Sequence, residues 1–213
     1  TRKKLNNTKS LISFIGAPWT LLVYMFGLKT DKNTIDQKKL SLKENDIKEI
    51  IPKLISYLCI HIEEQRNAGS DVVQIFDSWA GLIPNDKINE LCYKPNKKIV
   101  DFCKEKKIPV ICFPKGIKEN YKTFTDIVRP NGISIDYDVN PNWAKENLKD
   151  VCIQGGLDPK ILFEEENYLM SKVENYLSTF SDRPYIFNLG HGLLPETNPD
   201  ILIKIIDKVN KFK

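Results

Sequence analysis

The chain has 213 residues, 41% of them hydrophobic, and a net charge of +4, which are the length and composition of one globular domain with a sizeable core. Its 32 basic residues are scattered rather than gathered in a stripe, which argues against nucleic-acid binding. The five cysteines are odd in number and form no C-x-x-C, which disfavours a disulfide framework or a zinc ribbon and predicts a reduced, cytoplasmic protein.

The first predicted unit covers residues 10–28, which carry no charge. Their length approaches the roughly 20 residues that span a bilayer. However, Gly16, Ala17 and Pro18 stand in the middle of this run, and proline suits the first turn of a helix better than its interior. We therefore predict a buried strand at 11–16 followed by a helix at 18–27, and no membrane segment.

Strand-like and helical patterns alternate along the rest of the chain. Near-continuous apolar runs predict parallel strands, which we place at 11–16, 71–76, 109–113, 132–136, 151–154 and 185–189. Helical periodicity predicts helices at 18–27, 44–67, 87–106 (interrupted at Pro95), 143–148, 164–179 and 199–212, and residues 29–40 are predicted to form a surface loop. The alternation indicates one α/β domain over 1–213. A doubly wound sheet needs no further strand, whereas a closed (β/α)₈ barrel needs two more.

A histidine follows the last predicted strand, between two glycines. In parallel α/β folds the active site lies at the carboxyl ends of the strands, so His191 is predicted to lie on the functional edge. Gly190 and Gly192 would leave room for a ligand beside it. A structural histidine is the alternative. His61, the second histidine, falls inside the helix predicted at 44–67 and is expected to belong to the surface or the packing of that helix.

Two hydroxyl-bearing residues occupy similar positions near the ends of earlier strands. Tyr24 lies in the helix after the first strand and also fits plain packing in the core. Ser78 follows the second strand and also fits a helix cap. No G-x-S-x-G, phosphate-binding loop or H-E-x-x-H occurs, so these residues alone indicate no mechanism.

Five segments together resemble the uroporphyrinogen decarboxylase family, and they occur in the family's order: FIGAPWTLLVYM (14–25), QIFDSWAGLIP (74–84), PVICFPKG (109–116), QGGLDP (154–159) and FNLGHGLLPETNPD (187–200). The resemblance implies a (β/α)₈ TIM barrel, of which this chain supplies about six βα units as the carboxyl-terminal three-fifths. It also implies a lyase of haem biosynthesis that decarboxylates the four acetate side chains of uroporphyrinogen III without a cofactor, giving coproporphyrinogen III.

The resemblance also assigns roles to residues. It makes Tyr24, Ser78 and His191 substrate-binding residues and assigns no metal ligand. The family's aspartate and its Arg-x-x-Gly-Arg segment are expected in the amino-terminal part of the family and have no counterpart in 1–213, so no catalytic residue is assigned here. If residues 1–213 alone released CO₂ from uroporphyrinogen, Asp136 and Arg129 would be the first candidates for these roles within the chain.

Two departures from the family pattern and two alternatives accompany this interpretation. Gly156 stands where many relatives have asparagine and is expected to loosen a turn, and GLKTDKN (27–33) replaces a glycine-rich stretch.

A zinc methyltransferase of the same superfamily would need a His-x-Cys, which does not occur. The other alternative is a truncated or split-gene fragment that is inactive unless joined by its amino-terminal part. The expected partners are uroporphyrinogen and a second copy in a homodimer, with no nucleic acid and no membrane.

Overall fold

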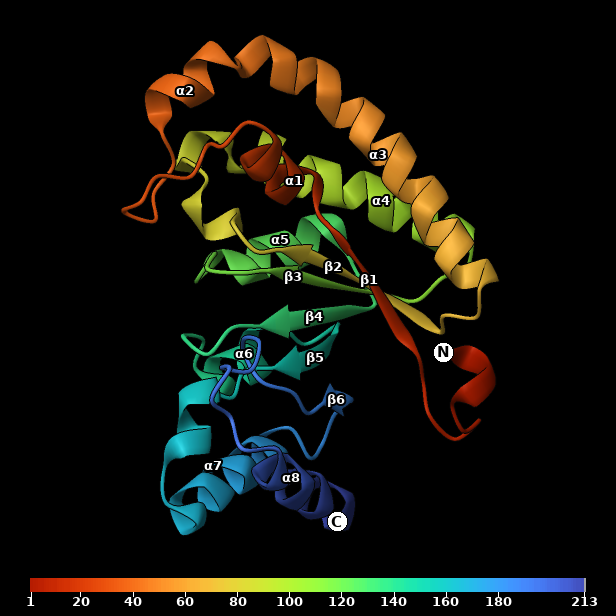
Figure 1. Cartoon of the computed structure of the whole chain (residues 1–213), viewed down its shortest axis with the longest axis vertical. Helices are drawn as coiled ribbons and strands as arrows, with labels where there is room; N and C mark the ends of the chain where they lie inside the picture. Colours follow the sequence, from red (N-terminus) through yellow and green to blue (C-terminus); the bar gives the residue numbers. More distant parts are fainter. Residues whose placement is uncertain (213) are drawn as a thin grey trace. The chain divides into compact units, whose positions relative to one another are not determined.

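The computed structural model describes residues 1–212 and contains six strands and eight α-helices over that range (Figure 1). The strands are β1 (Ile12–Gly16), β2 (Val72–Asp77), β3 (Val110–Pro114), β4 (Gly132–Ile135), β5 (Cys152–Gly155) and β6 (Tyr185–Ile186). The helices are α1 (Pro18–Met25), α2 (Gln37–Leu42), α3 (Glu44–Asn67), α4 (Lys94–Glu105), α5 (Asn120–Val128), α6 (Pro141–Asn147), α7 (Glu166–Thr179) and α8 (Pro199–Lys211). All six predicted strands are confirmed, although β6 is shorter than predicted.

The chain divides into two compact units, which meet in sequence between Asn131 and Gly132. In unit 1, β1 pairs with β2 and β2 with β3, all parallel, with Ile12 opposite Val72 and Val73 opposite Val110. In unit 2, β4 pairs with β5 and β5 with β6, again parallel. The predicted α/β class with six parallel strands is therefore confirmed, while the assignment of 1–213 to one domain stays a prediction.

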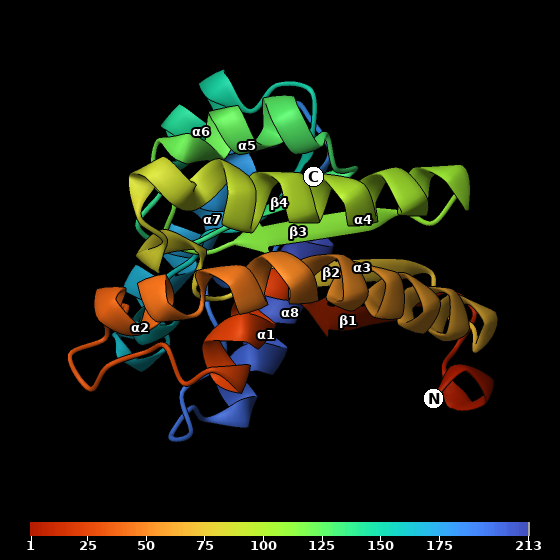
Figure 2. The same ribbon diagram turned by 90° about the horizontal axis from the view of Figure 1, so that it is seen from above.

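The long helix α3 has the bounds that its periodicity predicts. Its apolar residues recur every three or four positions, so they share one face, and that face is buried: Ile47, Ile55, Leu58 and Ile62. Helices α3 and α4 lie side by side in both ribbon views (Figures 1 and 2). Burial of these apolar side chains stabilises unit 1 through the hydrophobic effect.

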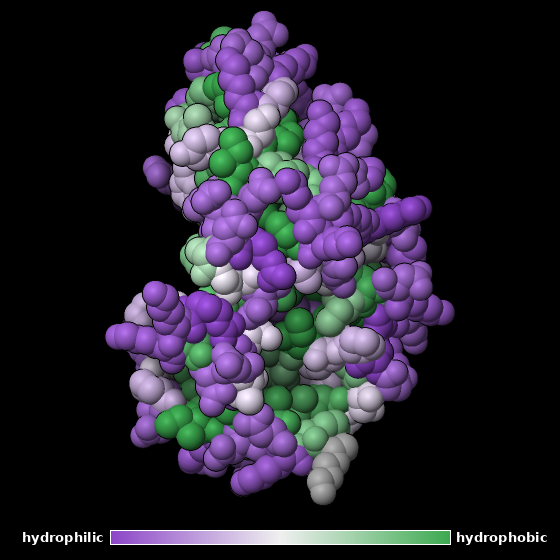
Figure 3. All heavy atoms as spheres, turned by 90° about the vertical axis from the view of Figure 1, so that its right-hand side faces the viewer, coloured by the Kyte–Doolittle hydropathy of each residue, from purple (hydrophilic) through white to green (hydrophobic). Residues whose placement is uncertain are grey.

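Unit 2 is organised around α7 and the strands β4 to β6. Leu169 and Val173 of α7 are fully buried, and the rings of Phe180 and Tyr185 stack with centroids 4.5 Å apart. Apolar side chains also reach the surface shown in Figure 3. The exposed large apolar residues of unit 2 include Ile186, Leu193, Leu194, Ile203 and Ile206.

Three sequence-based expectations are corrected. Residues 29–40 are not simply a loop, because Lys29 and Ile35 form an antiparallel bridge and α2 begins after Asp36, whose side chain accepts from the amide of Lys39. The helix predicted from residue 87 begins as a π-helix, Asn89–Tyr93, and α4 then starts with Pro95 in its first turn, where a missing N–H costs least. Helix α5 was not predicted, although Tyr121, Phe124 and Val128 give it a buried face.

The first strand is an edge of the unit 1 sheet, with uneven coverage. Phe14 is 65% exposed and Ile12 is 41% exposed, whereas Ile15 is 3% exposed. Because alternate residues of a strand point to opposite faces, one face of β1 is covered and the other is open. The uncharged stretch at 10–28 is divided between β1 and α1. No helix within residues 1–212 is long and apolar enough to cross a membrane.

Arg183 closes the end of α6 and provides a test of the packing of unit 2. Its guanidinium donates to the carbonyls of Lys145 (3.0 Å), Leu148 and Val151 (2.8 Å). Lysine keeps the charge but lacks the planar fork of donors. We expect Arg183→Lys to lower the free energy of unfolding by about 1.5–3 kcal/mol, measured by urea denaturation. The matched control is Arg129→Lys, because the Arg129 Nε donates to the single carbonyl of Asp126. Equal effects of the two changes would contradict this account.

Candidate functional site

In unit 1, the segment GAPWT (16–20) places α1 directly against the end of β2. The amide of Ala17 donates to the carbonyl of Phe76 (2.8 Å), so the parallel ladder continues one residue beyond β1. Pro18 then occupies the first turn of α1, where its fixed φ favours helix initiation. Trp19 is fully buried and its indole N–H donates to the carbonyl of Trp79 (2.9 Å). The segment GAPWT therefore fixes α1 to the loop that follows β2.

A buried carboxylate joins three elements at this point. Asp77, the last residue of β2, is 1% exposed. Its two oxygens accept from the Thr20 hydroxyl of α1 (2.8 Å) and the Asn96 amide of α4 (3.1 Å). The Cys92 thiol also hydrogen-bonds this carboxylate. Within residues 1–212 no lysine or arginine pairs with Asp77, so neutral donors alone balance its charge.

Burial governs the ionisation of this cluster. It raises the pKa of Asp77 to about 6, against the lowering effect of the hydrogen bonds from Thr20 and Asn96. Burial also raises the pKa of the Cys92 and Cys112 thiols well above the ordinary value, and the charge of Asp77 adds to this. Both thiols are therefore neutral at physiological pH. Over the described part of the chain, no three His, Cys, Asp or Glu side chains are grouped so as to hold a metal ion.

The two candidate hydroxyls of unit 1 lie around Trp79. Tyr24 is 65% exposed, so it is not a core residue, and its ring meets the Trp79 ring edge-on with centroids 6.2 Å apart. Ser78 is half-buried between Asp77 and Trp79 in the chain. It does not cap a helix, because the following 3₁₀ helix has Trp79 at its N-cap without a side-chain cap. The structure therefore brings Tyr24 and Ser78 to the same loop cluster.

Glycines let the next loop approach closely. A Cβ on Gly81 would lie 2.4 Å from the carbonyl oxygen of Gly116, and the Gly81 amide donates to the carbonyl of Lys115 (2.9 Å). Gly116 has a φ of +80°, which side chains rarely adopt. The segments FDSWAG and FPKG thus meet backbone to backbone, and the loops after β1, β2 and β3 form one cluster.

Sequence reasoning missed an aromatic row on the same sheet. Phe14, Phe76 and Phe113 come from β1, β2 and β3, and neighbouring rings pack edge-on with centroids 5.7 and 6.1 Å apart. Phe14 is exposed at the edge, and Phe76 precedes Asp77. The residue types were visible in the sequence, but only the strand register shows that they lie on one face.

In unit 2, the segment LGHG (189–192) places His191 directly after the tightly packed Gly190. The Gly190 amide donates to the carbonyl of Leu157 (2.7 Å), and a Cβ on Gly190 would lie 2.4 Å from the amide nitrogen of Tyr137. Gly190 therefore allows backbones to meet rather than leaving room for a ligand. At Gly192, by contrast, a Cβ would meet nothing within 4 Å.

The histidine itself is exposed, and its tautomer follows from its backbone contact. The Nδ1 of His191 accepts from the Gly192 amide (2.7 Å), so the proton of the neutral ring lies on Nε2, which can donate. His191 lies in unit 2, whereas Tyr24 and Ser78 lie in unit 1. His61 lies on the exposed surface of α3 and pairs with Gln65, as expected.

The turn at Gly156 is held rather than loosened. Gly155 and Gly156 have φ values of +85° and +105°, and the Tyr176 hydroxyl donates to the carbonyl of Gly156 (2.7 Å). A Cβ on Gly156 would lie 2.7 Å from the Tyr176 ring. Tyr176 thus occupies the space beside this position.

Asp136 and Arg129, the candidates within the chain for the roles of the family's aspartate and arginines, have local structural contacts. Asp136 is 2% exposed and its carboxylate accepts from the amide of Asp138 (3.2 Å) in the turn after β4. Arg129 ends α5 in the left-handed conformation with a φ of +54°. The two residues fall in different units, and these contacts assign neither a part in the site.

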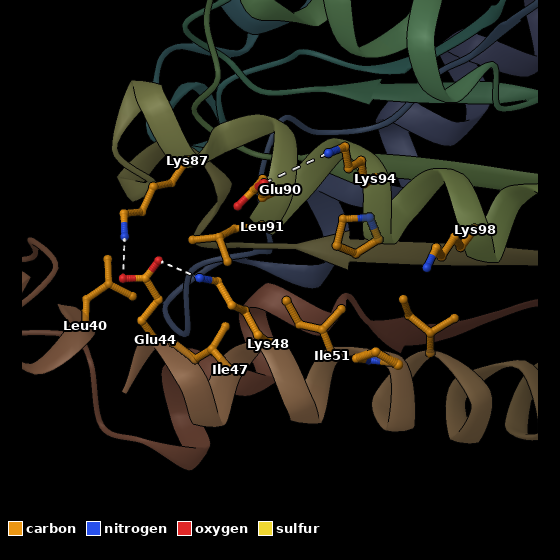
Figure 4. Close-up of a pocket in the computed structure, with 13 residues that line it drawn as sticks. Leu40, Glu44, Ile47, Lys48, Ile51, Lys87, Glu90, Leu91, Lys94 and Lys98 are labelled. Atoms are coloured by element: carbon orange, nitrogen blue, oxygen red, sulfur yellow. Dashed lines mark ion pairs between the residues drawn. The ribbon is translucent and has the colours of Figure 1, made fainter. Parts of the chain in front are cut away.

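A separate groove of about 340 Å³ lies in unit 1 among α2, α3, the π-helix and α4 (Figure 4). Its apolar lining includes Ile47, Ile51 and Leu91. Glu44 pairs with Lys48 (3.0 Å) and with Lys87 (3.7 Å) at one end of the groove. None of the three candidate residues lines it, so we do not assign it to the site.

These parallel βα units, with polar loops at the carboxyl ends of their strands, define an α/β protein of the barrel type. The fold is similar to that of a methyltransferase from Methanosarcina mazei, with a TM-score of 0.77 over 99% of this chain and 61% of that one. The sequences are 14% identical, so this likeness concerns the fold alone.

The family follows from the sequence comparisons. The model described as "Uroporphyrinogen decarboxylase (URO-D)" matches residues 1–212, and the chain belongs to this family. It is 41% identical to the uroporphyrinogen decarboxylase of Orientia tsutsugamushi (strain Ikeda), over 96% of this chain and 62% of that protein. It is 36% identical to that of Rickettsia bellii, over 100% of this chain and 63% of that protein. The chain thus spans somewhat over three-fifths of the length of these curated relatives.

The raised pKa of Asp77 predicts a pH-dependent stability. A carboxyl whose pKa rises on folding favours the folded state when protonated, and this contribution is lost as the pH rises through about 6. The shift corresponds to about 3 kcal/mol at neutral pH. We expect Asp77→Asn to gain unfolding free energy relative to the wild type between pH 4 and pH 7, by up to that amount, measured by urea denaturation. Asp86→Asn, at an exposed aspartate of unit 1, is the control. A pH-independent difference would contradict the prediction.

The glycines around His191 predict unequal effects of one added methyl group. Gly190→Ala forces backbone apart and should lower the free energy of unfolding by about 1–3 kcal/mol or more. Gly192→Ala enters open space and should change it by less than about 0.5 kcal/mol. Thermal unfolding of both variants checks this, and equal losses would show that the close approach at Gly190 is relieved elsewhere.

Proposed function

We propose that the whole protein to which this chain belongs is a uroporphyrinogen decarboxylase, a carboxy-lyase of haem biosynthesis. Membership of the family over residues 1–212 supports this. The observation that carries the proposal is the loop cluster around Asp77, because the Tyr24 ring packs against Trp79 there and Ser78 stands between Asp77 and Trp79 in the chain. The substrate is the anionic tetrapyrrole uroporphyrinogen.

Three residues of this chain bind the carboxylates of the substrate in this proposal. The hydroxyls of Tyr24 and Ser78 donate hydrogen bonds, and the Nε2–H of His191 donates a third. Hydrogen bonds to ionised acceptors are the stronger ones, so each donor contributes to orienting the substrate. The exposure of Tyr24 and His191 and the tautomer set at His191 support these roles.

The aromatic row supports the binding of a macrocycle of pyrrole rings. Phe14 and Phe76 offer an apolar surface beside the loop cluster, with the buried Phe113 packed against Phe76, and Phe76 precedes Asp77 and Ser78 in the chain. Apolar contact with pyrrole rings and polar contact with carboxylates are the two kinds of recognition that this substrate requires. The two kinds of side chain are adjacent in unit 1.

In the reaction, each acetate side chain loses CO₂. The bond from its methylene carbon to the carboxylate breaks, CO₂ leaves, and a proton is taken up to give a methyl group. We propose that the pyrrole is protonated first and held as a cation by the family's aspartate, which is expected in the amino-terminal part of the family. An anionic group in a water-poor site stabilises such a cation by electrostatics. The residues of this chain orient the carboxylates and require no cofactor for that task.

We propose a cytoplasmic protein that assembles as a homodimer and binds neither nucleic acid nor membrane. The reduced cysteines support the location, since the structure contains the five cysteines as free thiols.

Substitution of the three donors tests the proposal in the whole protein. Tyr24→Phe and Ser78→Ala each remove a hydroxyl donor, and His191→Asn removes the Nε2–H at the far side of the ring; each change should cost about 1.5–3 kcal/mol of substrate or transition-state binding. We expect lower kcat/KM and an accumulation of partly decarboxylated porphyrinogens, measured by chromatography of the oxidised products.

Matched controls exist on the surface of α3. Tyr57→Phe and His61→Asn alter residues of the same types that are exposed there, and both should leave the kinetics unchanged. Unchanged kinetics in all three donor variants would refute the assignment. Loss of thermal stability with normal activity would return the residue concerned to a structural role.

A further inference from the structure

The segment after α1 forms a small anchored hairpin. Lys29 and Ile35 form an antiparallel bridge, and the Thr30 amide donates to the carbonyl of Thr34 (2.9 Å). Its base is fixed, because Leu28 is fully buried and Ile35 is 6% exposed. The Asp36 amide also donates to the carbonyl of Leu28 (2.9 Å). The backbone at Lys29 is therefore held in place from both sides.

The side chain of Lys29 extends over the loop cluster of unit 1. Its ammonium lies 4.1 Å from the centroid of the Trp79 ring, within the range of a cation–π interaction. The same ring packs edge-on against Tyr24, and Trp79 follows Ser78 directly. Trp79 thus contacts both Lys29 and the ring of Tyr24, and it is the chain neighbour of Ser78.

The charge of Lys29 is not neutralised by the described residues. It is exposed, and no carboxylate of residues 1–212 forms an ion pair with it. Two other lysines of unit 1 are engaged by the protein, since the Lys39 ammonium donates to the carbonyl of Gly27 (3.1 Å) and Lys43 pairs with Asp46 (2.9 Å). A cation held against an aromatic face retains donors that an anionic ligand can use.

We propose that Lys29 binds a carboxylate of the tetrapyrrole substrate and adds a charged contact to the neutral donors Tyr24 and Ser78. The inference rests on the proposed function. Tyr24 comes from α1, Lys29 from the hairpin, and Ser78 and Trp79 from the loop after β2, so one carboxylate-binding subsite draws on three segments of unit 1. Because the contact is charged, it favours substrates with more carboxylates over products with fewer.

Kinetics of the whole protein test this role. Lys29→Gln removes the charge, Lys29→Arg keeps it, and Lys32→Gln is the matched control, an exposed lysine of the same hairpin. We expect Lys29→Gln to raise the KM for uroporphyrinogen at least about tenfold, the equivalent of one lost charged hydrogen bond. The kcat should change little, Lys29→Arg should restore most of the affinity, and Lys32→Gln should match the wild type.

A second variant and a second measurement keep the inference open to refutation. Lys29→Met retains the apolar stem over Trp79, so it replaces Lys29→Gln if that variant fails to fold. Binding of uroporphyrin, followed by titration calorimetry at low and high salt, should weaken with salt in the wild type and less steeply in Lys29→Met. Equal KM values for wild type and Lys29→Met would overturn the inference.

The binding experiment also separates this inference from the proposed function. If the wild type binds uroporphyrin and Lys29→Met binds it at least about tenfold more weakly, while uroporphyrinogen is not decarboxylated, the subsite stands and the proposed function falls. If decarboxylation is normal in both proteins with equal KM, the proposed function stands and the role of Lys29 falls. A wild type that binds no uroporphyrin overturns the subsite as well.

Discussion

The buried carboxylate of Asp77 is the constraint on which the arrangement of unit 1 depends. An ionised group without a counter-charge is costly to bury, so its oxygens must be satisfied by donors at fixed positions. Thr20 and Asn96 supply them from α1 and α4, which sets both helices relative to the end of β2. Tyr24 lies one helical turn after Thr20, and Ser78 is the next residue after Asp77. The positions of both candidate donors are thus tied to one carboxylate.

Close backbone contact is the second constraint, and it recurs in each unit. Gly81 approaches Gly116 in unit 1, and Gly190 approaches Tyr137 in unit 2, where an added Cβ would lie 2.4 Å from backbone atoms in both cases. Backbone cannot yield as a flexible side chain can, so these loops fit only around glycine. The glycines of the motifs therefore shape the loops that carry Ser78 and His191, rather than contacting a ligand themselves.

The chemistry of the loop cluster follows from what surrounds Trp79. Its ring contacts Tyr24 at one side and the Lys29 ammonium at another, and its carbonyl accepts from Trp19. A single aromatic side chain thus contacts both the ring of Tyr24 and the ammonium of Lys29. Recognition of a multiply anionic ligand benefits from such a combination, because neutral donors give direction and a cation gives attraction at longer range.

The sequence by itself determined the βα alternation, five of the six strands nearly to the residue and α3 to its exact bounds, because these depend on local periodicity and on proline and glycine. The short β6 and the break at Asn89–Tyr93 were less visible, since strand pairing and helix packing decide them. Among the candidate residues, the sequence identified Tyr24, Ser78 and His191 through family motifs. It showed neither the buried charge of Asp77 nor the ammonium of Lys29 over Trp79. Thr20 and Asp77, and likewise Lys29 and Trp79, are about fifty or more residues apart in the chain. Such contacts are made only when the strands align side by side, so the tertiary structure alone decided them.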